Sequence, residues 1–204
     1  MSHTSHTTAQ KWDKHYADAQ LSDTVNPCFV LKQHSNLLPF KGQALELACG
    51  LGGNARFLAQ CGLKTHAWDI SDNALSALNH WAQAHHAPIV PLITDLEQML
   101  LPYQQFDVIV VSRYLDRSLL SALQDALKPN GLLYYQTFLA PVQDNAPSKL
   151  EYYIGSGEFN QAWSKLKTLV YGEGWLTHEN TPETSPKNTA NRHRYAWYVG
   201  KKSL

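Results

Sequence analysis

The 204-residue sequence predicts an α/β fold, in which a doubly wound, mostly parallel seven-stranded sheet ends in a C-terminal antiparallel hairpin. Five nearly continuous apolar runs have the length of strands that are buried on both faces, as in a parallel sheet. Segments with apolar residues at helical spacing lie between several of these runs. After Phe138 the rhythm changes, because two β-rich runs follow each other without a convincing helix between them.

The order of these elements predicts a βαβ series. The expected strands are 44–49, 64–69, 89–94, 107–111 and 132–138, and the expected helices are 55–61, 73–85 and 116–127. Gly62 stands where the first helix should stop, Pro88 follows the second, and Asp116 is a suitable N-cap for the third. Crossovers in such a series are right-handed, which makes the sheet doubly wound.

The late part of the chain differs in character. A short helix is expected within 156–164, and strands 166–172 and 195–199 are expected to form the hairpin at the sheet edge. The long polar connection between them is either a functional loop or a mobile one. Residues 1–10 have no apolar segment and are interpreted as a disordered tail, which leaves 11–204 as a single domain.

Composition excludes several classes of partner. Lys+Arg and Asp+Glu are equal at 17 each, so no basic field predicts a nucleic-acid partner. No apolar run has the length of a membrane span, and no signal peptide opens the chain. The three cysteines show no metal-ligand spacing, so no metal is expected, and their odd number favours a reducing, cytoplasmic compartment.

The stretch ALELACGLGGNARFLA, residues 44–59, places glycines between an apolar strand and a helix. Gly50, Gly52 and Ala55 match G-x-G-x-x-A, a pattern that nucleotide-binding turns share. Glycine permits the turn and lets a cofactor approach the backbone closely. The alternative is an ordinary tight turn between a strand and a helix.

Acidic residues stand at the ends of neighbouring expected strands. Asp69 follows Gly50 by nineteen residues, where a carboxylate can accept hydrogen bonds from ribose hydroxyls. Alternatively, Asp69 only closes its strand, while Ser71 or Asp72 caps the next helix. Glu46 lies inside an apolar strand, where a carboxylate needs a compensating partner.

The motifs LELACGLGGNARFLA, HAWDIS, ITDLE, FDVIVVSRYLDR and LKPNGLLYYQTF resemble those of class I S-adenosylmethionine-dependent methyltransferases. The resemblance covers roughly Trp12 to the C-terminus and implies a three-layer Rossmann-like fold. It is closest to the tellurite-resistance-like and thiopurine-methyltransferase-like small-molecule branch. Members of that branch carry a leading WDxxYA, which here is Trp12, Asp13, Tyr16 and Ala17.

The resemblance also implies a cofactor, S-adenosyl-L-methionine, and the residues that bind it. Residues matching Glu46, Gly50 and Gly52 surround the amino-acid end of the cofactor. Asp69 holds the ribose, Ile70 packs on the adenine, and Asp95 with Leu96 reads the adenine edge. Ser112 and Trp12 complete the expected set, with Trp12 in a lid formed by N-terminal helices over about 11–40. Gly53 departs from the branch, whose members often have Arg there.

The implied reaction is direct displacement of the methyl group by a small-molecule acceptor, for which a thiol or a selenium or tellurium oxyanion is the leading interpretation. A general base is optional, so no catalytic residue is assigned. The candidates for the acceptor site are Arg113, Tyr114 and His178. Arg113 could orient an anion or form a surface ion pair with Asp116. Tyr114 could line a pocket or only pack, and His178 could contact the substrate or be solvated.

Two other functions fit part of this pattern. An NAD(P)-dependent reductase would use the glycine turn and Asp69, but it would not account for Glu46, Asp95 or the late hairpin. A non-catalytic S-adenosylmethionine-binding module would keep the cofactor pocket and lack an acceptor cavity. Oligomeric state is not readable from the sequence.

Overall fold

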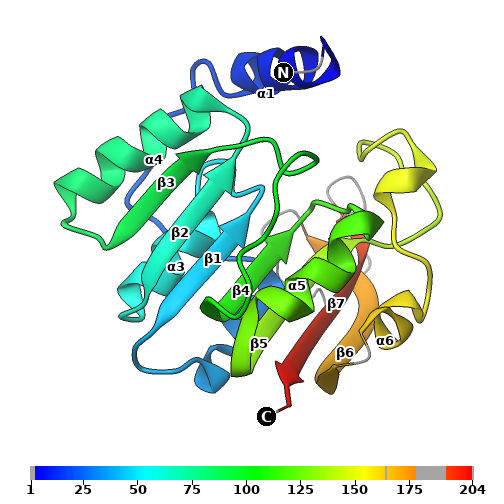
Figure 1. The fold of residues 1–204 in the computed structure, drawn as a ribbon. Helices are drawn as coiled ribbons and strands as arrows, with labels where there is room; N and C mark the ends of the chain where they lie inside the picture. The colour runs from blue at the N-terminus through cyan, green and yellow to red at the C-terminus, as the bar shows by residue number, and fades with distance from the viewer. Residues whose placement is uncertain (1–2, 164, 178–191, 204) are drawn as a thin grey trace.

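The computed structural model describes residues 3–163, 165–177 and 192–203, which form a seven-stranded sheet in the order β3-β2-β1-β4-β5-β7-β6 (Figure 1). Strands β1 to β5 run parallel, and β7 is antiparallel to both β5 and β6. The strands are β1 Gln43–Leu47, β2 Lys64–Asp69, β3 Ile89–Ile93, β4 Phe106–Ser112, β5 Leu127–Phe138, β6 Leu166–Thr177 and β7 Arg192–Lys202. The predicted fold class, including the C-terminal hairpin, is confirmed.

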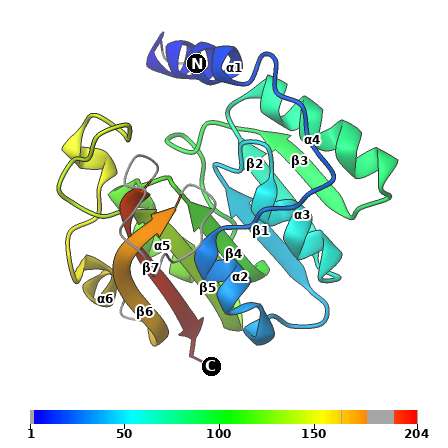
Figure 2. The same ribbon diagram turned by 180° about the vertical axis from the view of Figure 1, so that it is seen from behind.

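Helices cover both faces of the sheet and give it three layers (Figures 1 and 2). Helices α2, α3 and α4 lie on one face, and α5 and α6 lie on the other. None of the helices in the described part of the chain combines the length and apolar character that crossing a bilayer requires. The helical segments are α1 His3–His15, α2 Phe29–Gln33, η1 Ser35–Leu37, α3 Gly53–Gln60, α4 Asp72–Ala84, η2 Arg117–Leu119, α5 Leu120–Ala126, η3 Leu150–Tyr152 and α6 Glu158–Ala162.

The apolar strands follow from burial on both faces. Successive side chains of a strand point to opposite faces of the sheet. In β1, Leu45 and Leu47 pack in the core under α5 and α6, whereas Ala44 packs in the core under α2 and α3. Both faces of the central strands are therefore dry, which explains why their sequences are almost continuously apolar.

The structure differs from the sequence expectations at several element ends. Helix α1 begins at His3, inside the segment 1–10 that was expected to be a disordered tail. Residues 3–15 contain neither glycine nor proline, so nothing in the sequence interrupts the helix before the turn that follows it. The expected helix 116–127 is divided into η2 and α5, and the Asp116 side chain caps η2 by accepting a hydrogen bond from the Ser118 N–H.

Candidate cofactor and acceptor site

The glycine turn joins the carboxyl end of β1 to the first turn of α3. Gly50 and Gly52 have φ values of +50° and +69°, a region that glycine enters at little cost. The Gly52 N–H donates to the Cys49 carbonyl at 2.8 Å and closes the turn. At Gly53, a Cβ would lie 2.8 Å from the Asn26 carbonyl oxygen. The N-terminal segment thus fills the room that an arginine would need at this position.

Glu46 is buried beneath this turn and holds the N-terminus of α3. Its side chain is only 3% exposed. One carboxylate oxygen accepts from the Asn54 side-chain amide at 2.7 Å, and the other accepts from the Ala55 N–H at 2.6 Å. Burial raises the pKa of Glu46 to about 8, against the effect of these hydrogen bonds. The compensating partners that a buried carboxylate requires are therefore neutral donors.

A hydrogen-bond network connects Glu46 to helix α2 through Asn54. The Asn54 side-chain oxygen accepts from the Cys28 N–H at 2.7 Å, at the start of α2. This network ties α2, β1 and α3 together, and neither Asn54 nor Cys28 was singled out as a site residue from the sequence. Only the position of Glu46 inside an apolar strand signalled that such a partner must exist.

Asp69 ends β2 and contacts the glycine turn directly. Its Oδ2 accepts from the Gly50 N–H at 2.7 Å, and its Oδ1 accepts from the Ser71 N–H at 2.9 Å. The carboxylate is 7% exposed, and burial raises its pKa. Ser71 caps α4 by accepting from the Ala74 N–H, as one of the sequence alternatives expected. Asp69 thus ends its strand and also supports the glycine turn. Ile70 follows it directly in the chain.

Asp95 and Leu96 follow β3 on the other side of β2. The Asp95 carboxylate accepts from the Glu97 N–H at 3.1 Å and from the Gln98 side chain at 2.8 Å. Leu96 is 8% exposed and belongs to the core cluster under α5. These two residues therefore have clear structural partners of their own at the edge where the cofactor residues were predicted.

Helix α1 lies beyond the carboxyl ends of the parallel strands (Figure 1), and Tyr16 follows it directly in the chain. The Tyr16 hydroxyl lies 2.6 Å from the point that a Cβ on Gly50 would occupy. Trp12 stacks on Tyr16, with ring centroids 6.1 Å apart, and is 38% exposed. Burial, followed by the charge of Asp69, raises the pKa of Tyr16 to about 12. The expected site residues did not include Tyr16, although it belongs to the WDxxYA motif.

Ser112, Arg113 and Tyr114 follow one another at the carboxyl end of β4. The Ser112 side chain hydrogen-bonds the Cys28 thiol. Arg113 has a φ of +57°, which is uncommon outside glycine, and its side chain hydrogen-bonds Tyr195 on β7. The Tyr114 carbonyl accepts from the Tyr135 hydroxyl at 2.9 Å. Burial raises the pKa of Tyr16, and the positive charge of Arg113 acts in the opposite direction.

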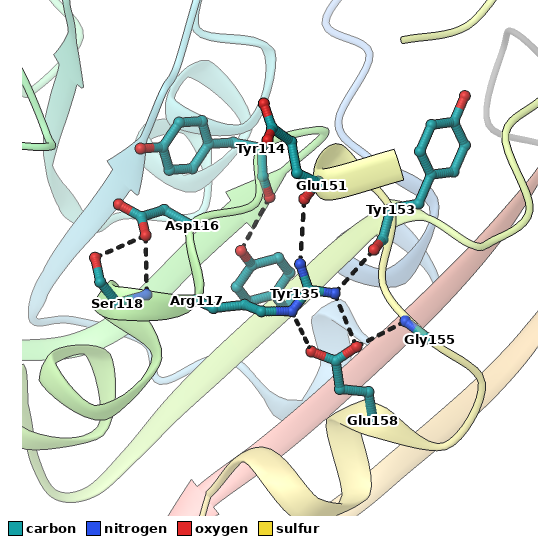
Figure 3. A network of polar contacts seen from close by, with 9 residues as sticks. All are labelled: Tyr114, Asp116, Arg117, Ser118, Tyr135, Glu151, Tyr153, Gly155 and Glu158. Atoms are coloured by element: carbon teal, nitrogen blue, oxygen red, sulfur yellow. Dashed lines mark hydrogen bonds and ion pairs between the residues drawn. The ribbon is translucent and has the colours of Figure 1, made fainter. Parts of the chain in front are cut away.

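Arg117 clamps the segment after β5 to the connection after β4 (Figure 3). Its Nε and one terminal nitrogen donate to the two carboxylate oxygens of Glu158, at 2.7 and 2.9 Å. The same guanidinium donates to the carbonyls of Glu151 at 3.2 Å and Tyr153 at 2.9 Å. Its planar fork suits such paired contacts. The clamp fixes the chain beside the carboxyl end of β5, where the Ile154 N–H donates to the Phe138 carbonyl.

The predicted site residues thus divide into three groups. The structure brings Glu46, Gly50 and Asp69 together around one turn, and Trp12 of helix α1 stacks on Tyr16, which covers that turn. The second group, at the same edge of the sheet, comprises Gly52, Ile70, Asp95, Leu96, Ser112, Arg113 and Tyr114. His178 lies outside the described residues.

Comparisons with known proteins agree with this architecture. Residues 44–131 match a family model described as a methyltransferase domain. TehB from Haemophilus influenzae is similar in structure, with a TM-score of 0.70 and 16% identity over 96% of this chain and 67% of that protein. Geranyl diphosphate C-methyltransferase from Streptomyces coelicolor, solved with S-adenosyl-L-homocysteine, is also similar. It has a TM-score of 0.69 and 12% identity over 98% of both chains. No curated protein sequence matches.

A third similar structure separates fold from reaction. The [4+2]-cyclase SpnF has a TM-score of 0.70 and 12% identity over 98% of this chain and 96% of that one. At such identities the likeness shows the fold. The match to the methyltransferase domain confirms the predicted enzyme class, an S-adenosylmethionine-dependent methyltransferase, and with it the cofactor that this class uses.

Proposed function

We propose that this chain transfers the methyl group of S-adenosylmethionine to a small-molecule acceptor by direct displacement. The observation that carries the proposal is the pair of buried carboxylates at the glycine turn, Glu46 and Asp69, which are 3% and 7% exposed. Burial raises the pKa of both groups, so a cation nearby stabilises their charged forms. S-adenosylmethionine carries a sulfonium and an ammonium group, and this donor set suits it.

The proposed cofactor contacts follow the order of the strands. Glu46, Gly50 and Gly52 take the amino-acid end, and Asp69 takes the ribose hydroxyls. Ile70, Asp95 and Leu96 take the adenine, while Ser112 and Trp12 close the site from β4 and from the lid. When bound, the cofactor supplies a methyl group on a positively charged sulfur. The protein holds the reactants in line, and such positioning supplies about 7–11 kcal/mol of a reaction barrier.

We place the acceptor on the Arg113 side of the site. Its guanidinium, held beside Tyr195, suits an anionic acceptor. A thiolate or a selenium or tellurium oxyanion already carries the negative charge, so it needs no general base. Tyr114 is the proposed pocket wall, and His178 is a further proposed acceptor contact.

Calorimetric titration tests the cofactor first. Wild-type protein should bind S-adenosylmethionine and S-adenosylhomocysteine at micromolar concentration and should bind neither NADH nor NADPH. Asp69→Asn should weaken both tenfold or more, because hydrogen bonds to a charged group are worth about 1.5–3 kcal/mol. Asp18→Asn, at an exposed position after the lid helix, is the control and should bind like wild type. Binding of a nicotinamide nucleotide alone would overturn the proposal.

An acceptor screen tests the second half. Thiols and selenium and tellurium oxyanions should yield methylated products, and Arg113→Met should raise KM for anionic acceptors more than it changes cofactor affinity. Tight cofactor binding without turnover of any acceptor would favour the non-catalytic binding module instead.

A further inference from the structure

Asp13 of helix α1 hydrogen-bonds the N-terminal end of α4. Its Oδ1 accepts from the Ser71 hydroxyl at 2.7 Å and from the Asn73 N–H at 3.3 Å. Its backbone carbonyl accepts from the Asn73 side-chain amide at 2.9 Å. Three hydrogen bonds therefore join Asp13 to Ser71, the N-cap of α4, and to Asn73 in its first turn, and the carboxylate lies where the helix dipole favours negative charge.

Ser71, which donates its hydroxyl to Asp13, also supports the glycine turn. Ser71 donates its N–H to Asp69, and Asp69 accepts from the Gly50 N–H. A continuous chain of hydrogen bonds thus runs from the lid helix through Ser71 and Asp69 to Gly50. Any movement of α1 away from α4 breaks the first link of this chain without touching the others.

Tyr16, the residue directly after α1, faces the same turn. Its backbone N–H donates to the Trp12 carbonyl at 3.0 Å, so the position of Tyr16 depends on the helix that Asp13 holds. The Tyr16 hydroxyl occupies the space directly above Gly50, at 2.6 Å from the point that a Cβ there would take. A cofactor that enters toward the Gly50 turn has to pass this ring, and a cofactor bound at the turn lies beside it. The lid therefore has to move for the cofactor to enter, and it must be held again afterwards.

We infer that Asp13 is a latch that holds helix α1 across the cofactor site and retains the bound cofactor. This role rests on the proposed function, in which Gly50 and Asp69 hold the cofactor. Asp13 is a positioning residue, because it acts through Ser71, Asn73 and the placement of Tyr16. Opening of the latch exposes the turn, and closing it encloses what the turn has bound.

The latch itself is tested in the ligand-free protein by hydrogen exchange. Asp13→Ala should speed exchange of the backbone amides at the C-terminal end of α1, while amides of α3 should exchange as in wild type. Asp18→Ala, which changes an exposed carboxylate just after the helix, is the matched control and should leave α1 unchanged. Equal protection of α1 in the Asp13→Ala and wild-type proteins would refute the latch.

Cofactor retention is tested by chasing labelled S-adenosylhomocysteine with an excess of the unlabelled compound. Asp13→Ala should dissociate about tenfold faster than wild type, as expected for loss of a charge-assisted hydrogen bond. Asp13→Asn keeps an acceptor oxygen and should recover most of the retention. A dissociation rate unchanged by Asp13→Ala would refute the retention role.

The two experiments fail in distinguishable ways. If wild-type protein binds no S-adenosylhomocysteine, the proposed function fails, while hydrogen exchange still decides whether Asp13 holds the helix. If wild type binds it and the Asp13→Ala protein shows neither faster exchange nor faster dissociation, the cofactor assignment stands and the inference about Asp13 is wrong.

Discussion

Replacing Gly52 by alanine tests how tightly the glycine turn is packed, because a second glycine serves as its control. Gly52 has a φ of +69°, and a Cβ there would lie 2.6 Å from both methyl carbons of Leu78 on α4. Gly157 has a φ of +73°, but a Cβ there would meet nothing within 4 Å. The two positions share a backbone conformation and differ in the surrounding space.

The expected costs follow from these two terms. An alanine in the left-handed region costs about 1–2 kcal/mol. The stiffer unfolded chain offsets about 0.4–1 kcal/mol of this at each position. Gly52→Ala also presses its Cβ against Leu78, and overpacking costs about 1–3 kcal/mol. We expect Gly157→Ala to lower the free energy of unfolding by about 1 kcal/mol, and Gly52→Ala by about 2–4 kcal/mol.

Urea unfolding followed by circular dichroism measures both effects. The midpoint should fall more for Gly52→Ala, with an unchanged denaturant slope. The Leu78→Ala variant should make the Gly52→Ala change less costly, because removal of the Leu78 methyl groups opens the space for the new Cβ. Equal costs at Gly52 and Gly157, or additive effects of the Gly52 and Leu78 variants, would refute the packing argument.

Three further predictions concern charged groups. Burial raises the pKa of Glu46 to about 8, so the folded protein holds a proton that the unfolded chain loses above about pH 4.5; stability should fall from pH 5 to pH 8, and Glu46→Gln should flatten that fall in urea titrations. Arg117 lowers the pKa of Glu158, so the stability lost in Arg117→Met, about 1 kcal/mol or less, should be present at neutral pH and vanish as the pH falls below the ordinary glutamate range. Arg56 donates to the Ser22 carbonyl at 2.6 Å and stacks on Trp81, so Arg56→Ala should speed limited proteolysis before α2, and an unchanged cleavage rate would contradict this anchoring role.

The central strands could be predicted from sequence because burial on both faces requires apolar residues at nearly every position of the strand. The ends of the hairpin could not. Gly172 and Gly174 lower the β propensity of β6, yet they lie where the Trp197 indole needs room, and a Cβ at Gly172 would lie 2.6 Å from that ring. Local propensity here gives way to packing between neighbouring strands, and β6 continues to Thr177.

The candidate site could likewise be predicted from the sequence only in part. Glu46 could be singled out because its charge contradicts the apolar strand around it. The contact of Tyr16 with Gly50 joins residues 34 positions apart and depends on the path of the intervening chain, which local periodicity does not encode. The motif WDxxYA named the right residues, whereas only the structure shows that Asp13 holds α4 while Tyr16 covers the turn.

The position of β7 has a consequence for how the protein is made. Residues 192–202 form the strand between β5 and β6 (Figure 1). The Lys202 ammonium donates to the Leu127 carbonyl at 2.7 Å. On the ribosome, β6 emerges before the strand that connects it to the rest of the sheet. Until residues 192–202 leave the exit tunnel, the edges of both β5 and β6 lack this partner, and unpaired edges favour aggregation. The sheet can therefore be completed only after residues 192–202 have been synthesised, and both strand edges are open to unwanted pairing until then.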